Sequence, residues 1–130
     1  MRLWHQDLID KLPRQQLLGQ HRECCALRGK GWGKKHATVD YVFEYDPSRL
    51  VAYHYKIMQE MEQRGYNPNK DWYLHNYRGK NLGLDYGFAT DYEYWLDKEI
   101  YPEHNKSYLR ECVENLAEKE CVCRYIEEVI

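Results

Sequence analysis

The chain has 130 residues, of which 43% are hydrophobic and 31% charged, and its net charge is −2. This length suits one core, so we expect residues 1–130 to form a single domain. No apolar run approaches the ~20 residues that span a bilayer, and no signal-peptide pattern is present. We therefore expect a cytoplasmic protein with no membrane partner.

The charges are unevenly distributed along the chain. Residues 1–80 carry a net charge of +5, whereas residues 81–130 carry −7. A basic first part suits contact with a polyanion such as nucleic acid, but solvated helix surfaces also produce such charge runs. Charge alone leaves both interpretations open.

The cysteines and histidines match no common metal or disulfide pattern. The five cysteines have no spacing typical of a disulfide framework or a zinc ribbon, and the six histidines form no H-E-x-x-H motif. We expect the cysteines to be reduced and packed on helices, and we expect no metal or organic cofactor. A metal site assembled from distant residues is the alternative.

The first predicted helix covers residues 13–28 and ends at the Gly29-Lys30-Gly31-Trp32-Gly33 breaker. Because successive residues turn by about 100°, one face of this helix carries polar and small residues. Arg22 lies at the edge of that face, whose members are Gln16, Gly19, Gln20 and Glu23. Gly19 costs about 1 kcal/mol in a helix interior, so we expect another backbone, such as the N-terminal segment, to approach it closely.

Three features follow the first helix. The glycine-rich loop is expected to be a turn whose neighbouring lysines can contact phosphates, and the β-prone residues 38–43 are expected to be an extended connection. Asp46 and Pro47 predict the cap and first turn of a second helix, with an apolar stripe that runs to Gly65. His54 lies on that stripe, so we expect it to be a core histidine.

The remainder of the chain is rich in aromatic residues. Residues 66–101 contain ten aromatics among Gly, Asn and Pro, which predicts an irregular packed segment with a short helix near 91–100. These rings can pack in the core or stack on unpaired bases. A long helix is expected from residue 106 to the end. The predicted fold is all-α and compact, with three to four helices and a long aromatic-rich irregular segment.

Several motifs occur in a distinctive order. A short N-terminal segment precedes Gln15-x-Leu17-x5-Glu23 with Arg22 inside it, and Tyr45-Asp46 then opens a helix that ends Gln63-Arg64-Gly65-Tyr66-Asn67, before Tyr77-Arg78-Gly79. Over residues 1 to about 80, this order resembles the phage endonuclease V family of pyrimidine dimer DNA glycosylases. The resemblance implies an all-α fold in which the N-terminal segment lies between the major helices and the terminal amine lies near Glu23.

The resemblance also implies a reaction. In that family the terminal amine attacks the deoxyribose of a damaged pyrimidine, a Schiff base forms, and β-elimination cuts the strand without a cofactor. Carried over by position, the nucleophile is the α-amine of Met1, which the large Arg2 should keep in place, and Glu23 assists together with Arg22. The residues implied to contact damaged double-stranded DNA are Arg2, Gln16, His21, Lys30, Lys34, Lys35 and Arg78.

The leading hypothesis is thus a DNA glycosylase with AP lyase activity. Two alternatives remain. The chain can be a noncatalytic nucleic-acid-binding domain that keeps the fold, or an interaction protein whose acidic C-terminal helix recruits a partner or dimerises. An α-amine has an ordinary pKa near about 8, so a useful fraction of it is nucleophilic at neutral pH, which favours the enzyme.

Overall fold

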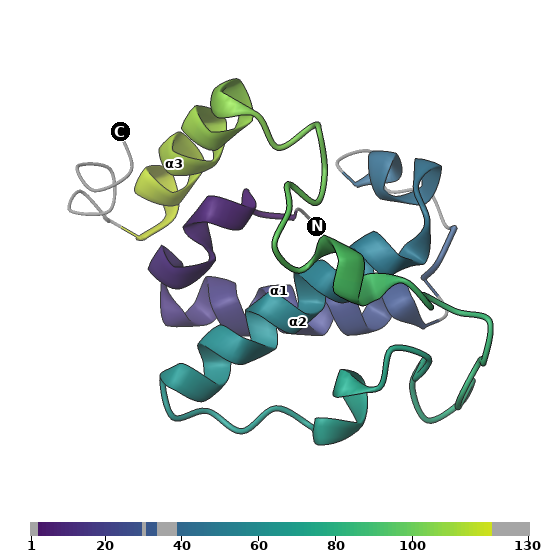
Figure 1. Ribbon diagram of the computed structural model, residues 1–130. Coiled ribbons are helices and arrows are strands. Elements are labelled where there is room, and N and C mark those ends of the chain that lie inside the picture. Colours follow the sequence, from purple (N-terminus) through teal and green to yellow (C-terminus); the bar gives the residue numbers. More distant parts are fainter. Residues whose placement is uncertain (1–2, 30, 34–38, 121–130) are drawn as a thin grey trace.

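The computed structural model describes residues 3–29, 31–33 and 39–120, without the side chains of 118–120 (Figure 1). The described residues form three α-helices and no strand: α1 (Arg14–Arg28), α2 (Pro47–Gln63) and α3 (Lys106–Glu120). Four short 3-10 helices accompany them: η1 (Gln6–Lys11), η2 (Asp40–Glu44), η3 (Lys70–Tyr73) and η4 (Tyr92–Trp95). The predicted all-α fold with a long irregular segment is confirmed.

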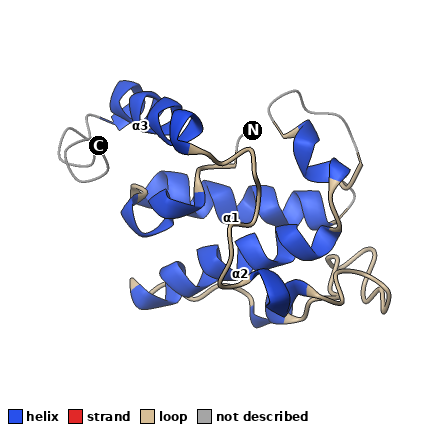
Figure 2. Ribbon diagram, turned by 45° about the horizontal axis from the view of Figure 1, so that its top comes forward, coloured by secondary structure: helices blue, strands red, loops and turns tan. Residues whose placement is uncertain are grey.

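Helices α1 and α2 lie side by side and form the centre of the fold (Figure 2). The Asp46 side chain caps α2 by accepting a hydrogen bond from the Ser48 amide at 2.8 Å. The helix ends before Gly65, whose φ of 88° is readily adopted only by glycine. The predicted bounds of both helices are therefore confirmed to within one or two residues, and α3 is confirmed as far as Glu120.

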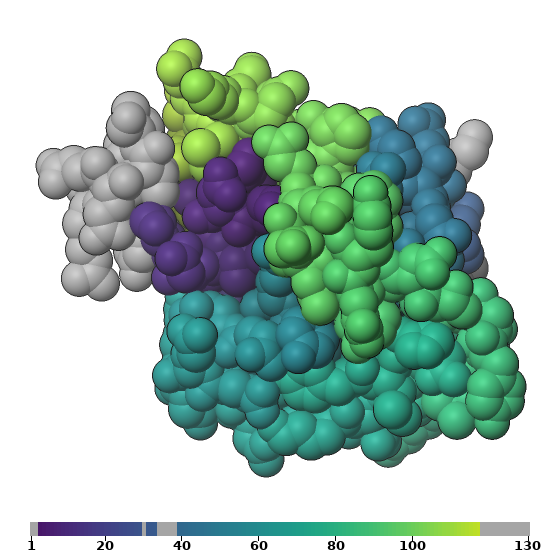
Figure 3. Space-filling model, in the orientation of Figure 1, coloured from purple at the N-terminus to yellow at the C-terminus, as the bar shows by residue number. Residues whose placement is uncertain are grey.

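The N-terminal segment lies between α3 and the pair formed by α1 and α2 (Figures 1 and 3). Leu3 and Trp4 are buried, and η1, which the sequence analysis did not predict, buries Leu8 in the same core. The Tyr108 hydroxyl on α3 donates to the Leu3 carbonyl at 2.6 Å. The segment is thus held by backbone contacts as well as by apolar burial, in the position that the family resemblance implied.

Two sequence predictions are wrong. The described part of residues 38–43 is not extended, because η2 begins at Asp40 and the Val42 amide bonds to the Val39 carbonyl at 3.0 Å. Without a strand partner, a 3-10 turn satisfies these backbone groups locally, which overrides β propensity. The helix predicted near 91–100 is a single 3-10 turn, η4.

The close backbone neighbour expected at Gly19 stays a prediction, because residues 1–2 of the N-terminal segment lie outside the described residues. Among the described atoms, the nearest to a methyl group placed on Gly19, outside the helix backbone, is Arg22 Nη2 at 3.8 Å. The described residues therefore provide no close backbone neighbour that would require glycine here.

Among the described aromatic residues, some pack in the core and others are exposed, and stacking on unpaired bases stays a prediction. Tyr53 and Tyr101 are fully buried in the core, whereas Tyr86 is 80% exposed. The Arg49 guanidinium lies between the rings of Tyr45 and Trp95, at 4.2 and 4.1 Å from their centroids. Such cation–π contacts let a charged side chain connect the irregular segment to α2. Within the described residues, no helix is long and apolar enough to span a membrane.

A buried histidine cluster lies beside the N-terminal segment. His104 is only 5% exposed, its Nε2 lies 2.6 Å from the Tyr41 hydroxyl, and its ring stacks on Tyr108 and His5. Burial, with a smaller contribution from His5, lowers the pKa of His104 to about 3. The folded protein therefore holds this histidine neutral.

We expect acid to destabilise the protein through His104. The unfolded chain takes up a proton at this residue below pH about 6.5, so stability is lost as the pH falls from there toward 3. Between pH 7 and pH 5 the loss from His104 is about 2 kcal/mol. Urea unfolding of the wild type and of His104→Gln at pH 7 and pH 5 measures how much of the lost stability comes from His104. Equal pH dependence in the two proteins would contradict the prediction.

Candidate active site on helix α1

The polar face of α1 carries the residues that the sequence analysis singled out. Gln16, Gln20 and Glu23 are four and three residues apart, so their side chains lie on one side of the helix. Glu23 is half-buried, and Arg22 is exposed at the edge of this face. We call the surface formed by Gln16, Gln20 and Glu23 the α1 polar face.

Gln20 connects this face to the N-terminal segment. Its side chain is almost fully buried, and its Oε1 accepts a hydrogen bond from the Trp4 amide at 2.7 Å. The same oxygen lies 2.8 Å from the Tyr53 hydroxyl, which also donates to the Trp4 carbonyl at 2.5 Å. At its other end, Gln20 Nε2 donates to the Glu23 carboxylate at 3.1 Å. One amide therefore contacts both the N-terminal backbone and the acidic residue.

Gln16 presents an acceptor on the same face. Its Oε1 is buried and has no hydrogen-bond partner among the described residues, although the residue as a whole is half-buried. A buried acceptor without a partner costs free energy, which a hydrogen bond from a ligand would recover. A polar ligand at the α1 polar face would find this acceptor available.

The other predicted site residues fall into two groups. Met1, Arg2, Lys30, Lys34 and Lys35 lie outside the described residues, so their roles stay predictions. Arg78 is described, and it has a structural role that the sequence analysis missed. Its guanidinium donates to the carbonyls of Arg28 and Gly29 at 2.8 and 3.2 Å and pairs with Asp85.

Arg28 makes the reverse contact, from α1 to the irregular segment. It is fully buried, and its Nη atoms donate to the carbonyls of Trp72, Leu74 and Tyr77 at 2.7, 2.7 and 3.1 Å. Burial lowers the pKa of Arg28 to about 10, which leaves it charged at neutral pH. Arg28 and Arg78 together attach the irregular segment to the C-terminal end of α1.

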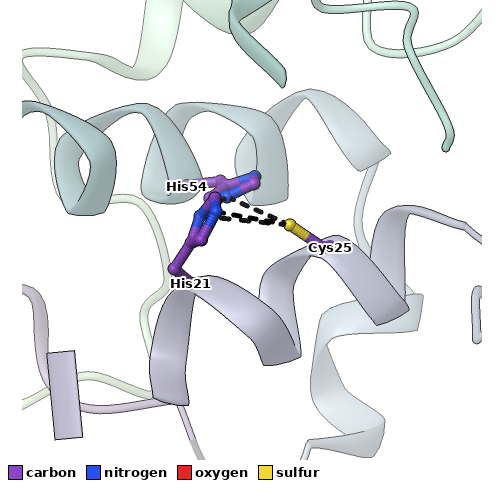
Figure 4. Close-up of side chains that lie close together, drawn as sticks. All are labelled: His21, Cys25 and His54. Carbon is purple, nitrogen blue, oxygen red and sulfur yellow. Dashed lines mark hydrogen bonds between the residues drawn. The ribbon is translucent and has the colours of Figure 1, made fainter. Parts of the chain in front are cut away.

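Two histidines, His21 and His54, lie between α1 and α2 (Figure 4). Arg28 determines which ring nitrogen of His54 carries the proton. Its Nη1 lies 3.0 Å from His54 Nδ1, and because arginine has only donors, this ring nitrogen must accept. Burial lowers the pKa of His54 well below its ordinary value, with a further contribution from the Arg28 charge. The neutral ring therefore carries its proton on Nε2, which donates to His21 Nδ1 at 2.8 Å. The expectation that His54 is a core histidine is confirmed.

Three potential metal ligands meet here, in an arrangement that the sequence pattern did not show. Cys25 Sγ lies 3.8 Å from His54 Nε2 and 3.9 Å from His21 Nδ1. Zinc binds such groups at about 2.0 Å for nitrogen and 2.3 Å for sulfur, so a modest rearrangement would bring the three atoms around one ion.

The surroundings of the cluster do not suit a cation. A metal would need the lone pair of His54 Nε2, but the donor from Arg28 places the proton there, whereas metal-bound histidines usually donate their second N–H to an acceptor. Burial raises the pKa of Cys25 to about 12, which keeps the thiol protonated, and the Arg28 charge repels a cation. We interpret the cluster as a hydrogen-bond chain from Arg28 through His54 to His21.

Two described clefts lie away from the α1 polar face. One runs between η1 and α2, with Asp10 and Lys56 in its walls, and the other lies beside η4. Glu23 lines neither of them. The sequence pattern placed Gln20 on the α1 polar face but indicated no role for it. The only signal in the sequence was the three-residue spacing between Gln20 and Glu23.

Comparisons with known proteins concern the first part of the chain. The sequence model of a family described as pyrimidine dimer DNA glycosylase matches residues 1–74. This range includes α1, α2 and the N-terminal segment, and therefore all of the α1 polar face. No curated protein and no solved structure matches the chain.

We expect Arg28→Met to destabilise the protein strongly. It would remove the charged donor from three partly buried contacts to backbone carbonyls, at a cost of about 3 kcal/mol or more. The matched control is Arg22→Met, because Arg22 is exposed on the same helix and its replacement should change stability by no more than about 0.5 kcal/mol. Urea unfolding of the two variants compares them directly. Equal losses would show that Arg28 does not hold the segment.

We also expect the His21–Cys25–His54 cluster to bind no zinc. After incubation with zinc and dialysis, metal analysis should give the same zinc content for the wild type and for Cys25→Ser, because His54 bonds to the positively charged Arg28. One equivalent of zinc in the wild type that is lost in Cys25→Ser would contradict this prediction.

Proposed function

The chain belongs to the pyrimidine dimer DNA glycosylase family, and we propose that it removes damaged pyrimidines from double-stranded DNA and then cuts the strand as an AP lyase. The proposed nucleophile is the α-amine of Met1, and the proposed assisting residue is Glu23. The proposed chemistry needs no metal or organic cofactor.

One observation supports the catalytic pair more than any other. The Trp4 amide is held by the same Gln20 side chain that contacts Glu23. Three residues separate the Met1 nitrogen from the Trp4 nitrogen, and extended backbone covers at most about 3.5 Å per residue. The amine is therefore confined to within about 10 Å of an atom that is already fixed beside the α1 polar face.

The proposed reaction proceeds in two stages. The lone pair of the neutral amine attacks C1′ of the damaged nucleotide, the glycosidic bond breaks with its electrons going to the base, and the base gains a proton. Loss of the amine proton and opening of the sugar ring, in which O4′ is protonated, give the iminium ion. Removal of a C2′ proton then expels the 3′ phosphate with the electrons of the C3′–O bond, which cuts the strand.

Glu23 suits the proton transfers in this sequence. A carboxylate beside the amine can accept the proton that the amine loses, and its negative charge stabilises the positively charged sugar intermediate. Gln20 Nε2 is a neutral donor, so its contact holds Glu23 without cancelling this charge. The carboxylate remains suited to act as a base.

The proposed DNA contacts surround the same face. Arg22 is exposed next to Glu23 and can bind a phosphate through two parallel hydrogen bonds, and Gln16 offers its unpartnered acceptor. His21, the residue after Gln20 on α1, is proposed as a further DNA contact. Arg78 acts indirectly, because it holds the segment after residue 74 against α1. Arg2, Lys30, Lys34 and Lys35 complete the proposal as phosphate contacts.

Borohydride trapping tests this function. Duplex DNA with an abasic site or a pyrimidine dimer should form a covalent adduct with the wild type, because borohydride reduces the iminium. Adding two residues before Met1 displaces the amine and should abolish the adduct, whereas the same two residues added after Ile130 should not. Glu23→Gln should slow adduct formation by about 100-fold or more, and the exposed Glu99→Gln, with the same charge change, serves as its control.

The remaining outcomes separate the alternatives. If the wild type binds the duplex in a salt-dependent way but forms no adduct, the proposed enzymatic activity is contradicted. A noncatalytic nucleic-acid-binding domain is then the remaining alternative. An adduct of equal yield in the N-terminally extended protein would instead assign the nucleophile to another amine.

A further inference from the structure

The Gln20 amide has two ends that contact two different parts of the proposed site. Its Oε1 bonds to the Trp4 amide at 2.7 Å, and its Nε2 bonds to the Glu23 carboxylate at 3.1 Å. The side chain is 1% exposed, so water does not compete for these contacts. A shift of the N-terminal backbone is therefore transmitted to the carboxylate through one rigid, planar group.

The surroundings determine which way the amide points. The Trp4 amide can only donate, and the Tyr53 hydroxyl donates its hydrogen toward two acceptors, the Trp4 carbonyl and Gln20 Oε1. The Trp4 N–H therefore requires oxygen at this end of the amide, and the Tyr53 hydroxyl is compatible with it. The NH2 group must then lie at the other end, where it faces a carboxylate that can accept its hydrogen.

We propose that Gln20 is a positioning residue, which holds the N-terminal segment and the Glu23 carboxylate in one geometry through the two ends of its amide. This inference rests on the proposed function. Gln20 itself contacts neither the substrate nor the reacting atoms, and it acts by fixing where the amine and the carboxylate meet. Because a reaction between positioned groups is sensitive to displacements of about 1 Å, its loss should lower the rate more than it lowers stability.

The isosteric variant Gln20→Glu separates this role from a purely structural one. It keeps an oxygen acceptor for Trp4 and Tyr53 but replaces the donor to Glu23 with a second carboxylate oxygen. Two carboxylates about 3 Å apart resist double ionisation, so one of them takes up a proton. The acidic limb of the pH–rate profile for adduct formation should therefore move up by about one pH unit or more, with at least a tenfold lower rate at pH 6.

Tyr53→Phe is the matched control. It removes the hydroxyl that supports the N-terminal end of the amide but leaves the contact between Gln20 and Glu23 intact. We expect a slower reaction at every pH with an unchanged profile. Circular dichroism and thermal melting establish that the variants fold. If Gln20→Glu does not fold, the shorter neutral Gln20→Asn replaces it, and its loss of the donor to Glu23 should move the same limb up by a smaller amount.

The outcomes distinguish this inference from the function on which it rests. If the wild type forms the adduct and Gln20→Glu keeps the wild-type rate and pH profile, the positioning role of Gln20 is wrong. The proposed enzymatic activity is then still supported. If the wild type forms no adduct, the proposed function fails, and with it the positioning role. NMR titration of the labelled Glu23 carboxylate then reports on the contact itself, because an unchanged titration in Gln20→Glu would show that the two side chains do not meet.

Discussion

The buried backbone of Leu3 and Trp4 is the constraint on which the rest of the site depends. Peptide groups that leave water must find hydrogen-bond partners, and this segment has no helix or sheet to supply them. Each of the three α-helices contributes one side chain instead: Gln20 from α1, Tyr53 from α2 and Tyr108 from α3. Leu3 and Trp4 are thus held by polar contacts within an apolar core.

Helix α1 uses the same physical device at its other end. Arg28 donates to three carbonyls of the irregular segment after residue 71. In the same way, Gln20 hydrogen-bonds to the backbone of the segment before η1. Both side chains are fully or almost fully buried, and both satisfy backbone groups that lack regular partners. One helix therefore orders two irregular parts of the chain, and its polar face lies between them.

The sequence was sufficient to predict features that follow from local rules. The proline and glycine boundaries located α1 and α2, and the spacing of Gln16, Gln20 and Glu23 placed them on one face. What it could not show depends on contacts between distant residues. Residues 39–43 were mispredicted because their β propensity has no strand partner within the described residues. Nothing in the sequence indicated that Arg28 is buried against the irregular segment, or that Cys25 meets two histidines.

We propose that the terminal amine is the nucleophile of a DNA glycosylase with Glu23 as the assisting residue, and the most direct test locates the covalent bond. The borohydride-reduced adduct with abasic duplex DNA is digested with protease, and mass spectrometry identifies the modified peptide. The account predicts that the sugar remnant is attached to the α-nitrogen of Met1. A remnant on a lysine side chain, with the N-terminal peptide unmodified, would contradict it.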